Sequence, residues 1–144
     1  MKQAVLFACT LNAVRSPMAA ALLRHLTRGE VYIESAGVKA GTLDPLAVEA
    51  MDEIGLQIGK HTPRRFEDLE DGSFDLVITL SPEAQHKAME LTRTAATQVE
   101  YWPTMDPTAV EGSREQRLNA YRAVRDQLMQ RLKQRFGASI AADT

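Results

Sequence analysis

The sequence predicts an α/β fold: a single-domain, three-layer sandwich in which a four-stranded parallel sheet is flanked by helices. Two observations predict it. Short apolar runs alternate with helical patterns, and no repeat or long linker interrupts that alternation. The 144 residues suit one domain spanning 1–144, with about 138–144 expected to form a flexible tail. Hydrophobic residues make up 44% of the chain and charged residues 25%, which is typical of a globular protein.

Four apolar runs are the predicted strands, at residues 4–8, 31–33, 74–80 and 99–102. The first and third are apolar throughout, as expected of strands that are buried on both faces. In α/β folds with a parallel sheet, ligands bind beyond the carboxyl ends of the strands, where loops meet the first turns of helices. The sequence therefore places a site after residue 8.

Helix-capping patterns separate these strands. Ser16 is expected to cap a helix that has proline at its first position, and Asp44 to cap a second helix that carries Ile54 on its apolar face and stops at Gly55. Ser81 precedes a third helix, whose inner face is expected to include Ala84, Ala88 and Leu91. The last helix opens with a capping box formed by Ser113 and Gln116. Its predicted buried residues are Leu118, Tyr121, Val124, Leu128, Leu132 and Phe136.

Charge and composition exclude several classes of function. The net charge is −2 with a pI near 5.9, which does not favour nucleic-acid binding. No apolar run approaches the roughly 20 residues that cross a bilayer, and the first residues lack a signal-peptide core, so we expect a cytoplasmic protein without a membrane partner. The single cysteine, Cys9, rules out an internal disulfide and a cysteine-rich zinc site, and no histidine pair has metal-ligand spacing.

The loop after the first strand has the composition of a phosphate-binding loop. Its backbone can curl so that successive N–H groups converge, and the following helix adds its own free N–H groups and partial positive charge. The expected nucleophile is Cys9, because this setting favours the reactive thiolate. The expected oxyanion-binding residues are Thr10, Leu11, Asn12, Ala13, Val14, Arg15 and Ser16.

Individual residues of this loop suit separate tasks. The guanidinium of Arg15 offers paired donors to two phosphoryl oxygens. Asn12 tolerates a left-handed backbone conformation better than most residues. Ser16 can cap the helix, and its hydroxyl can also bond to the thiolate.

Residues 9–17 resemble the C-x5-R-S-P signature of low-molecular-weight protein tyrosine phosphatases and the related thioredoxin-coupled arsenate reductases. Further landmarks follow in the order of that family and extend the resemblance over nearly the whole chain. They are Ser35-Ala36-Gly37, His61, Phe74-Asp75 and Asp106-Pro107.

The resemblance implies a mechanism without cofactor or metal. Cys9 attacks phosphorus, Arg15 holds the oxyanion, and Asp106 protonates the leaving group. Asp106 also lacks an evident capping role, unlike Asp44. The resemblance further implies that Ser35 and His61 support Asn12 from behind the loop.

Several residues depart from the family pattern. Leu11 replaces a usual glycine, Val14 replaces a second cysteine, and Ala13 stands where isoleucine or threonine distinguishes phosphotyrosine from phosphoarginine. The aromatic pair expected after Asp106-Pro107 is absent. Two other sets of residues each have two possible roles. Tyr101 and Trp102 form either a substrate wall or core, and a cluster of Lys60, Arg64 and Arg65 either attracts anions or is simply solvated.

The sequence favours a phosphatase acting on phosphate monoesters, with protein phosphotyrosine as the expected substrate. The expected partners are phosphorylated proteins or small phosphate esters, and oxyanions such as phosphate, sulfate or arsenate. Arsenate reduction with an external thiol and phosphoarginine hydrolysis are alternatives, as is a non-enzymatic phosphoryl carrier or phosphoprotein-binding module. The lone cysteine favours hydrolysis, because no second thiol exists for an internal relay.

Overall fold

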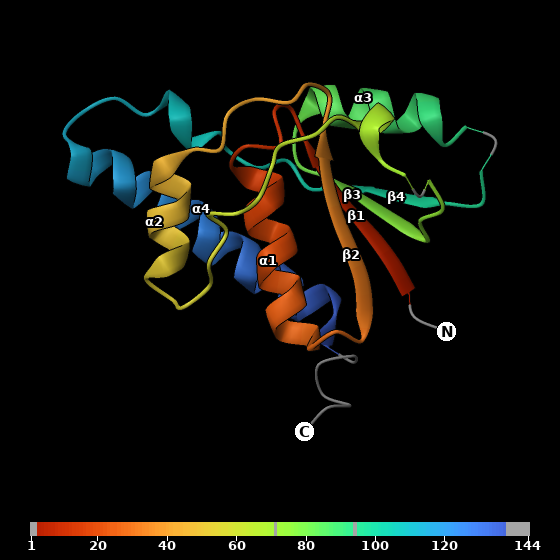
Figure 1. The fold of residues 1–144 in the computed structure, drawn as a ribbon, viewed down its shortest axis with the longest axis horizontal. Coiled ribbons are helices and arrows are strands. Elements are labelled where there is room, and N and C mark those ends of the chain that lie inside the picture. Colours follow the sequence, from red (N-terminus) through yellow and green to blue (C-terminus); the bar gives the residue numbers. More distant parts are fainter. Residues whose placement is uncertain (1–2, 71, 94, 138–144) are drawn as a thin grey trace.

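The structure, a computed structural model, describes residues 3–70, 72–93 and 95–137, so the tail expected at 138–144 lies outside the described residues. Strands and helices alternate along the chain, as predicted (Figure 1). The elements are β1 (Gln3–Cys9), α1 (Arg15–Thr27), β2 (Val31–Gly37), α2 (Pro45–Asp52), β3 (Leu76–Thr79), α3 (Pro82–Leu91), β4 (Gln98–Tyr101) and α4 (Arg114–Arg135). Two 3-10 helices, η1 (Phe66–Asp68) and η2 (Pro107–Ala109), lie in connecting segments.

The four strands form one parallel sheet in the order β2-β1-β3-β4. The chain leaves β1 toward β2 on one side, and β3 then pairs with β1 on the other side. The loops that follow β1 and β3 therefore diverge and leave a crevice between them, which is the usual ligand site in such sheets. Cys9 ends β1, and Ser81 follows β3, so both lie at this crevice.

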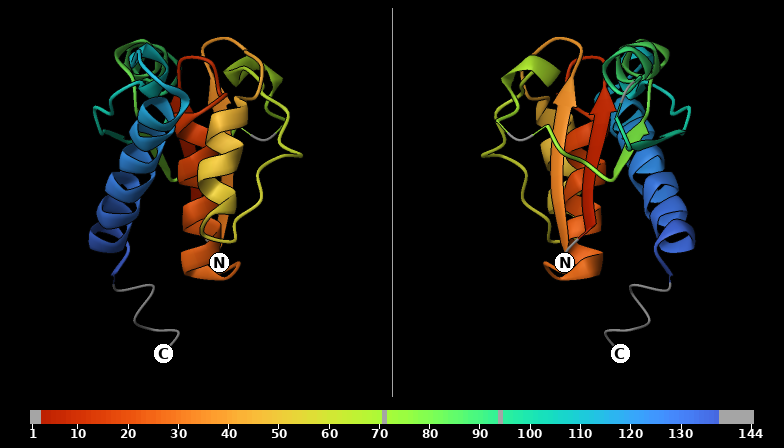
Figure 2. Two further views of the ribbon diagram at one scale, coloured as in Figure 1. Left: turned by 90° about the vertical axis from the view of Figure 1, so that its left-hand side faces the viewer. Right: turned by 90° about the vertical axis from the view of Figure 1, so that its right-hand side faces the viewer.

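Helices cover both faces of the sheet, which confirms the three-layer prediction (Figure 2). Alternate residues of β1 enter different cores, as the two-residue period of a strand requires. Val5 and Phe7 pack with α1, α2 and α4 in the larger core, whereas Leu6 and Ala8 pack with α3 and η1 in the smaller one. With both faces of β1 buried, the loop that follows it starts from a rigid support.

Most predicted helix ends are confirmed. Asp44 accepts a hydrogen bond from the backbone N–H of Leu46, and Ser81 accepts one from the N–H of Ala84. The capping box of α4 is formed as predicted. All six residues predicted to be buried on the last helix are buried, five of them on α4 and the sixth, Phe136, at its C-cap.

Three predictions about the helices are wrong. Ser16 does not cap α1, because the helix begins at Arg15 with Val14 at its N-cap, and the Ser16 hydroxyl bonds inside the loop instead. Helix α2 ends at Asp52, so Ile54 falls beyond it and is exposed. Leu91 is also exposed, because it is the last residue of α3 and lies past the part of the helix that packs on the sheet.

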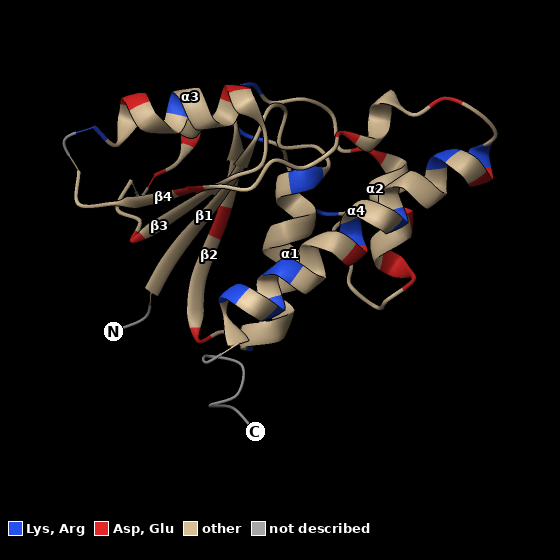
Figure 3. Cartoon of the chain, turned by 180° about the vertical axis from the view of Figure 1, so that it is seen from behind, with Lys and Arg blue, Asp and Glu red and all other residues tan. Residues whose placement is uncertain are grey.

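Ion pairs join α2 to α4, where charges of both signs occur (Figure 3). The carboxylate of Glu53, directly after α2, accepts hydrogen bonds from Arg122 and from Arg125. Arg125 also donates to the carbonyl of Ala50 at 2.7 Å. These contacts hold α2 against α4 at the side of the site. None of the described helices is long and apolar enough to span a membrane.

Candidate active site

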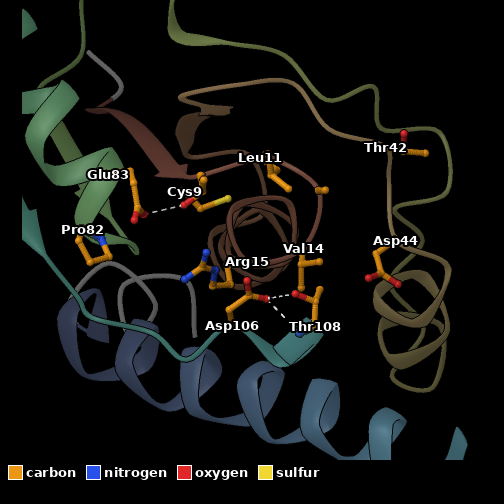
Figure 4. A pocket seen from close by; sticks show the side chains of 12 residues that line it. Cys9, Leu11, Val14, Arg15, Thr42, Asp44, Pro82, Glu83, Asp106 and Thr108 are labelled. Carbon is orange, nitrogen blue, oxygen red and sulfur yellow. Dashed lines mark hydrogen bonds between the residues drawn. The ribbon is translucent and has the colours of Figure 1, made fainter. Parts of the chain in front are cut away.

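A pocket of about 450 Å³ opens at the carboxyl edge of the sheet, over the loop that joins β1 to α1 (Figure 4). Cys9 lies at the end of β1, Arg15 at the start of α1, and Asp106 just before η2. These three predicted residues all line the pocket. The fold thus brings together groups that are separated by up to about a hundred positions in the chain.

The loop backbone is held open by the segment that follows β2. The carbonyls of Cys9, Thr10 and Leu11 accept hydrogen bonds from the N–H groups of Val38, Lys39 and Gly41. In a trans peptide the N–H points opposite to the carbonyl. The N–H groups in the same peptides, those of Thr10, Leu11 and Asn12, therefore point away from that segment, as an anion site requires.

Asn12 is the centre of the buried support behind the loop. It is fully buried and has a φ of 54°, which confirms the predicted left-handed conformation. Its Nδ2 donates to Oγ of Ser16 at 2.8 Å and to Oγ of Ser35 at 3.0 Å. Its Oδ1 accepts from the backbone N–H of Arg64 at 3.0 Å, which fixes the orientation of the amide because a backbone N–H can only donate.

His61 completes this support. Its Nε2 lies 3.0 Å from Oδ1 of Asn12, so this nitrogen must carry the hydrogen. Burial lowers the pKa of His61 below its ordinary value of 6.5, and the nearby charge of Arg24 acts in the same direction, against the hydrogen bond to Asn12. A neutral ring that donates from Nε2 is therefore the form present at neutral pH.

The Cys9 sulfur is the end point of this hydrogen-bond chain. Sγ lies 2.9 Å from Oγ of Ser16. Ser16 accepts from Asn12, and its own hydrogen can go to the sulfur or, over a longer 3.5 Å, to the carbonyl of Ala36. A hydroxyl that donates to sulfur stabilises negative charge there.

Arg15 is buried and points from α1 toward the pocket. Its Nη1 donates to the carbonyl of Thr104 at 2.9 Å and more weakly to that of Leu80 at 3.5 Å. Within the described part of the chain, these are the hydrogen bonds that hold its guanidinium. Nε and Nη2 remain to bind two oxygens of a tetrahedral anion.

Asp106 has a local bonding role that the sequence did not reveal. Its Oδ1 accepts from the backbone N–H of Thr108 at 3.0 Å and from the Thr108 hydroxyl at 2.7 Å, so it caps η2. The expectation that Asp106 has no capping role is wrong. A 3-10 turn of three residues is too short to be seen in hydrophobic periodicity. The cap orients the carboxylate, which still lines the pocket.

The charged cluster and the aromatic pair lie elsewhere. Arg64 pairs with Glu34, and Arg65 with Asp68, while Lys60 is not among the residues that line the pocket. Trp102 is buried in the larger core, which confirms the alternative of core packing for that residue. Neither aromatic residue lines the pocket.

Five lining residues were not anticipated as site residues: Thr42, Asp44, Pro82, Glu83 and Thr108. Of these residues, Glu83 is the one that the sequence could most readily have indicated. It is the second residue of a helix that follows a buried strand, and such positions face the carboxyl edge of the sheet.

A profile of the family described as low molecular weight phosphotyrosine protein phosphatase matches residues 4–144. The chain belongs to this family.

Proteins similar to this chain are named for different activities. An arsenate reductase of Shouchella clausii is 37% identical over 92% of this chain and 94% of its own length. A solved arsenate reductase in a phosphate-binding state shares 26% identity, with a TM-score of 0.73, and covers 94% of this chain and 98% of its own. The YwlE arginine phosphatase with a phosphorylated active-site serine shares 27% identity, with a TM-score of 0.73, and covers 92% of this chain and 93% of its own.

The family, the arsenate reductases and the position of Cys9 together identify a cysteine-dependent enzyme. This finding removes the non-enzymatic phosphoryl carrier and binding module from the alternatives. It leaves the substrate open among phosphate esters, phosphoarginine and arsenate.

Proposed function

We propose that this protein is a phosphatase that hydrolyses phosphate monoesters, protein phosphotyrosine among them, through a phosphocysteine on Cys9. The observation that carries the proposal is the convergence of Cys9, Arg15 and Asp106 on one pocket. A nucleophile, an oxyanion-binding cation and a proton donor are the groups that the reaction needs.

In the first step, the Cys9 thiolate attacks phosphorus. An S–P bond forms while the bond from phosphorus to the ester oxygen breaks, and its electron pair goes to that oxygen. Asp106 gives a proton to the departing oxygen, which leaves as an alcohol or phenol. The loop N–H groups and Arg15 hold the remaining phosphoryl oxygens throughout.

In the second step, water attacks the phosphocysteine. Asp106, now a carboxylate, takes a proton from the water as the O–P bond forms. The S–P bond breaks and its electron pair returns to sulfur, so orthophosphate is released and the thiolate is restored. The hydroxyl of Ser16 stabilises the returning negative charge. A reduced thiol is required at every turnover, so we expect the enzyme to act in the cytoplasm, which keeps thiols reduced.

Arsenate reduction is the second candidate, because relatives at up to 37% identity are named arsenate reductases. The pocket suits arsenate and phosphate equally, since both are tetrahedral oxyanions. However, the chain has no second cysteine to form an internal disulfide with Cys9. Reduction of a Cys9–arsenate adduct would therefore need an external thiol such as glutathione, two molecules of which are oxidised to one disulfide at each turnover and supply the two electrons.

Kinetics on phosphotyrosine, phosphoarginine and arsenate with glutathione separate these activities. We expect the wild-type enzyme to hydrolyse phosphotyrosine faster than it reduces arsenate, and Cys9→Ser to lose turnover while it still binds phosphate. Full activity in Cys9→Ser, or arsenate turnover that exceeds ester hydrolysis, would overturn the proposal.

Asp106→Asn tests the proton donor specifically, because asparagine keeps an oxygen that can accept from the N–H of Thr108. Phenyl phosphate has a poor leaving group that needs protonation, whereas p-nitrophenyl phosphate has a good one. The measured quantity is kcat/KM, which reports the steps up to cleavage of the ester bond and not the second step that both substrates share. We expect Asp106→Asn to lower kcat/KM on phenyl phosphate by roughly 10²- to 10⁴-fold, and much less on p-nitrophenyl phosphate. An equal loss of kcat/KM on both substrates would argue against proton donation by Asp106.

A further inference from the structure

The pocket beyond the phosphate-binding loop is acidic. Among the described residues, three carboxylates line it, from Asp44, Glu83 and Asp106, against one cation, Arg15. All three accept hydrogen bonds: Asp44 from Leu46 and from the Tyr121 hydroxyl, Asp106 from Thr108, and Glu83 from Thr10. The proposed mechanism uses Asp106 alone. Of the other two, Glu83 is the carboxylate that bonds to a residue of the phosphate-binding loop.

Glu83 approaches the nucleophile from α3 (Figure 4). Its Oε2 accepts from the hydroxyl of Thr10, the residue next to Cys9, at 2.9 Å. Its own backbone N–H, and then the Thr10 hydroxyl, lower the pKa of Glu83 below its ordinary value, so it is ionised at neutral pH. Within the described residues, Glu83 forms no salt bridge.

A negative charge at this place repels the phosphoryl group that the loop attracts. The repulsion is offset when the substrate brings its own positive charge close to the phosphate. The pocket has room for more than a phosphoryl group, since about 450 Å³ is the size of sites that hold whole small ligands. Of the described residues that line the pocket, none is a lysine and none is an aromatic residue that could pack on an uncharged ring. Arg15 is the cation whose charge acts on Glu83, and it is engaged by backbone carbonyls at the base of the pocket.

We infer that Glu83 is a specificity-determining residue that favours phosphorylated protein segments with a lysine or arginine next to the phosphorylated residue. This inference rests on the proposed phosphatase function and adds a substrate class to it. The cationic side chain lies against Glu83 while the phosphoryl group occupies the loop over Cys9. The pairing acts on substrate recognition and leaves the chemical steps at Cys9 unchanged.

A purely structural role for Glu83 makes a different prediction. If the carboxylate only orders Thr10, its removal affects every substrate equally. Glu83→Gln distinguishes the two roles, because glutamine keeps an oxygen that can accept from Thr10 but carries no charge. Glu90→Gln is the matched control, since Glu90 lies on the same helix but is not among the pocket-lining residues.

The test compares two phosphotyrosyl peptides that differ only in lysine or glutamine beside the phosphotyrosine. For the wild type at low salt, we expect kcat/KM to be about two- to fivefold higher for the lysine peptide, as for a partly exposed ion pair. The ratio of kcat/KM for the lysine peptide to that for the glutamine peptide should fall to about one in Glu83→Gln. It should remain at the wild-type value in Glu90→Gln. It should also shrink at 0.5 M NaCl, because salt screens the pairing.

Two results would overturn the inference: a wild-type ratio near one, or an unchanged ratio in Glu83→Gln with both peptides slowed equally. Failure of the proposed function has a separate signature. In that case the wild type would hydrolyse neither peptide and would leave p-nitrophenyl phosphate intact. Turnover of p-nitrophenyl phosphate without a charge preference would remove the role of Glu83 alone.

Discussion

Single side chains behind the loop determine how the Cys9 sulfur is presented. Asn12 binds Ser16, and Ser16 binds Cys9, so the Cys9 sulfur belongs to a buried hydrogen-bond network. Cys9 is 2% exposed and Asn12 is fully buried. Buried and fully bonded polar networks are rigid, and loss of one member leaves others unpaired.

Substitution of Ser16 by alanine removes the hydroxyl that donates to sulfur. A hydrogen bond to a charged group contributes about 1.5–3 kcal/mol, so we expect kcat to fall roughly ten- to hundredfold. The loss should appear mainly in breakdown of the phosphocysteine, when negative charge returns to sulfur. Rapid-quench measurement of the initial burst and of the steady state checks this. An unchanged steady-state rate would show that the hydroxyl does not assist the sulfur.

Asn12 has two separable roles, in backbone conformation and in hydrogen bonding. Asn12→Gly keeps access to the positive φ but removes the side chain, whereas Asn12→Ala loses both. We expect both variants to lose turnover, and Asn12→Ala to be less stable than Asn12→Gly by about 1–2 kcal/mol because of its left-handed backbone. Urea unfolding and kcat measurements check the two effects. Wild-type turnover in Asn12→Gly would show that the network is dispensable.

At the scale of elements, the end of β2 and the loop after β1 pack backbone against backbone. Gly37 pairs with Cys9 in the sheet register and is the last residue of β2. A Cβ at Gly37 would lie 2.5 Å from the carbonyl oxygen of Lys39 and 2.8 Å from the backbone nitrogen of Asn12. Only a glycine allows the two segments to approach this closely.

Gly37→Ala should therefore displace the loop. We expect a loss of about 1–3 kcal/mol of stability from overpacking, together with a larger fractional loss of kcat/KM than the stability change alone would cause. Gly59→Ala is the control, because its Cβ would meet only Val48 Cγ1 at 3.9 Å, an ordinary contact. Thermal unfolding and p-nitrophenyl phosphate kinetics on both variants test this. Equal activity in the two would contradict a close-packing role for Gly37.

At the scale of the whole molecule, α4 fastens α2 beside the pocket. Tyr121 of α4 donates to Asp44, which caps α2 and lines the pocket. Arg122 and Arg125 of α4 bind Glu53 at the other end of α2. One wall of the site is thus set by contacts between segments about seventy residues apart.

The Glu53 contacts predict a pH dependence of stability. The hydrogen bond from Arg122, followed by that from Arg125 and the charges of both, lowers the pKa of Glu53 to about 2 from an ordinary value of 4.5, despite the opposing effect of desolvation. A lowered folded-state pKa means that the unfolded chain binds the proton more readily. The ionised Glu53 carboxylate therefore adds to the free energy of unfolding above about pH 4.5, and this stabilisation is lost as the pH falls toward 2.

Glu53→Gln should lower the Tm at pH 7, and the difference from the wild type should shrink at pH 3. Thermal unfolding at both pH values measures this, with Glu30→Gln as the control, because Glu30 is exposed and takes part in none of the ion pairs between described residues. A difference between wild type and Glu53→Gln that is equal at both pH values would show that the charge of Glu53 does not stabilise the fold.

Local patterns in the sequence determined the elements and much of the loop. The apolar runs identified the strands, and the caps at Asp44, Ser81 and Ser113 are formed as predicted. The left-handed Asn12 also followed from residue type. Each of these depends on neighbours within a few positions, so the sequence contains the necessary information.

Only the tertiary structure decided how these elements meet. The order β2-β1-β3-β4 places α3 beside the loop after β1, and this puts Glu83 against Thr10, seventy-three positions away. The same packing directs Ser16 to Cys9 rather than to the helix end, and gives Asp106 its place in the pocket while it caps η2. Such contacts depend on strand order and packing between distant segments, which periodicity and capping patterns do not encode. The sequence alone therefore predicted that Cys9 and its loop form the site, whereas only the fold showed that acidic side chains line the pocket beyond that loop.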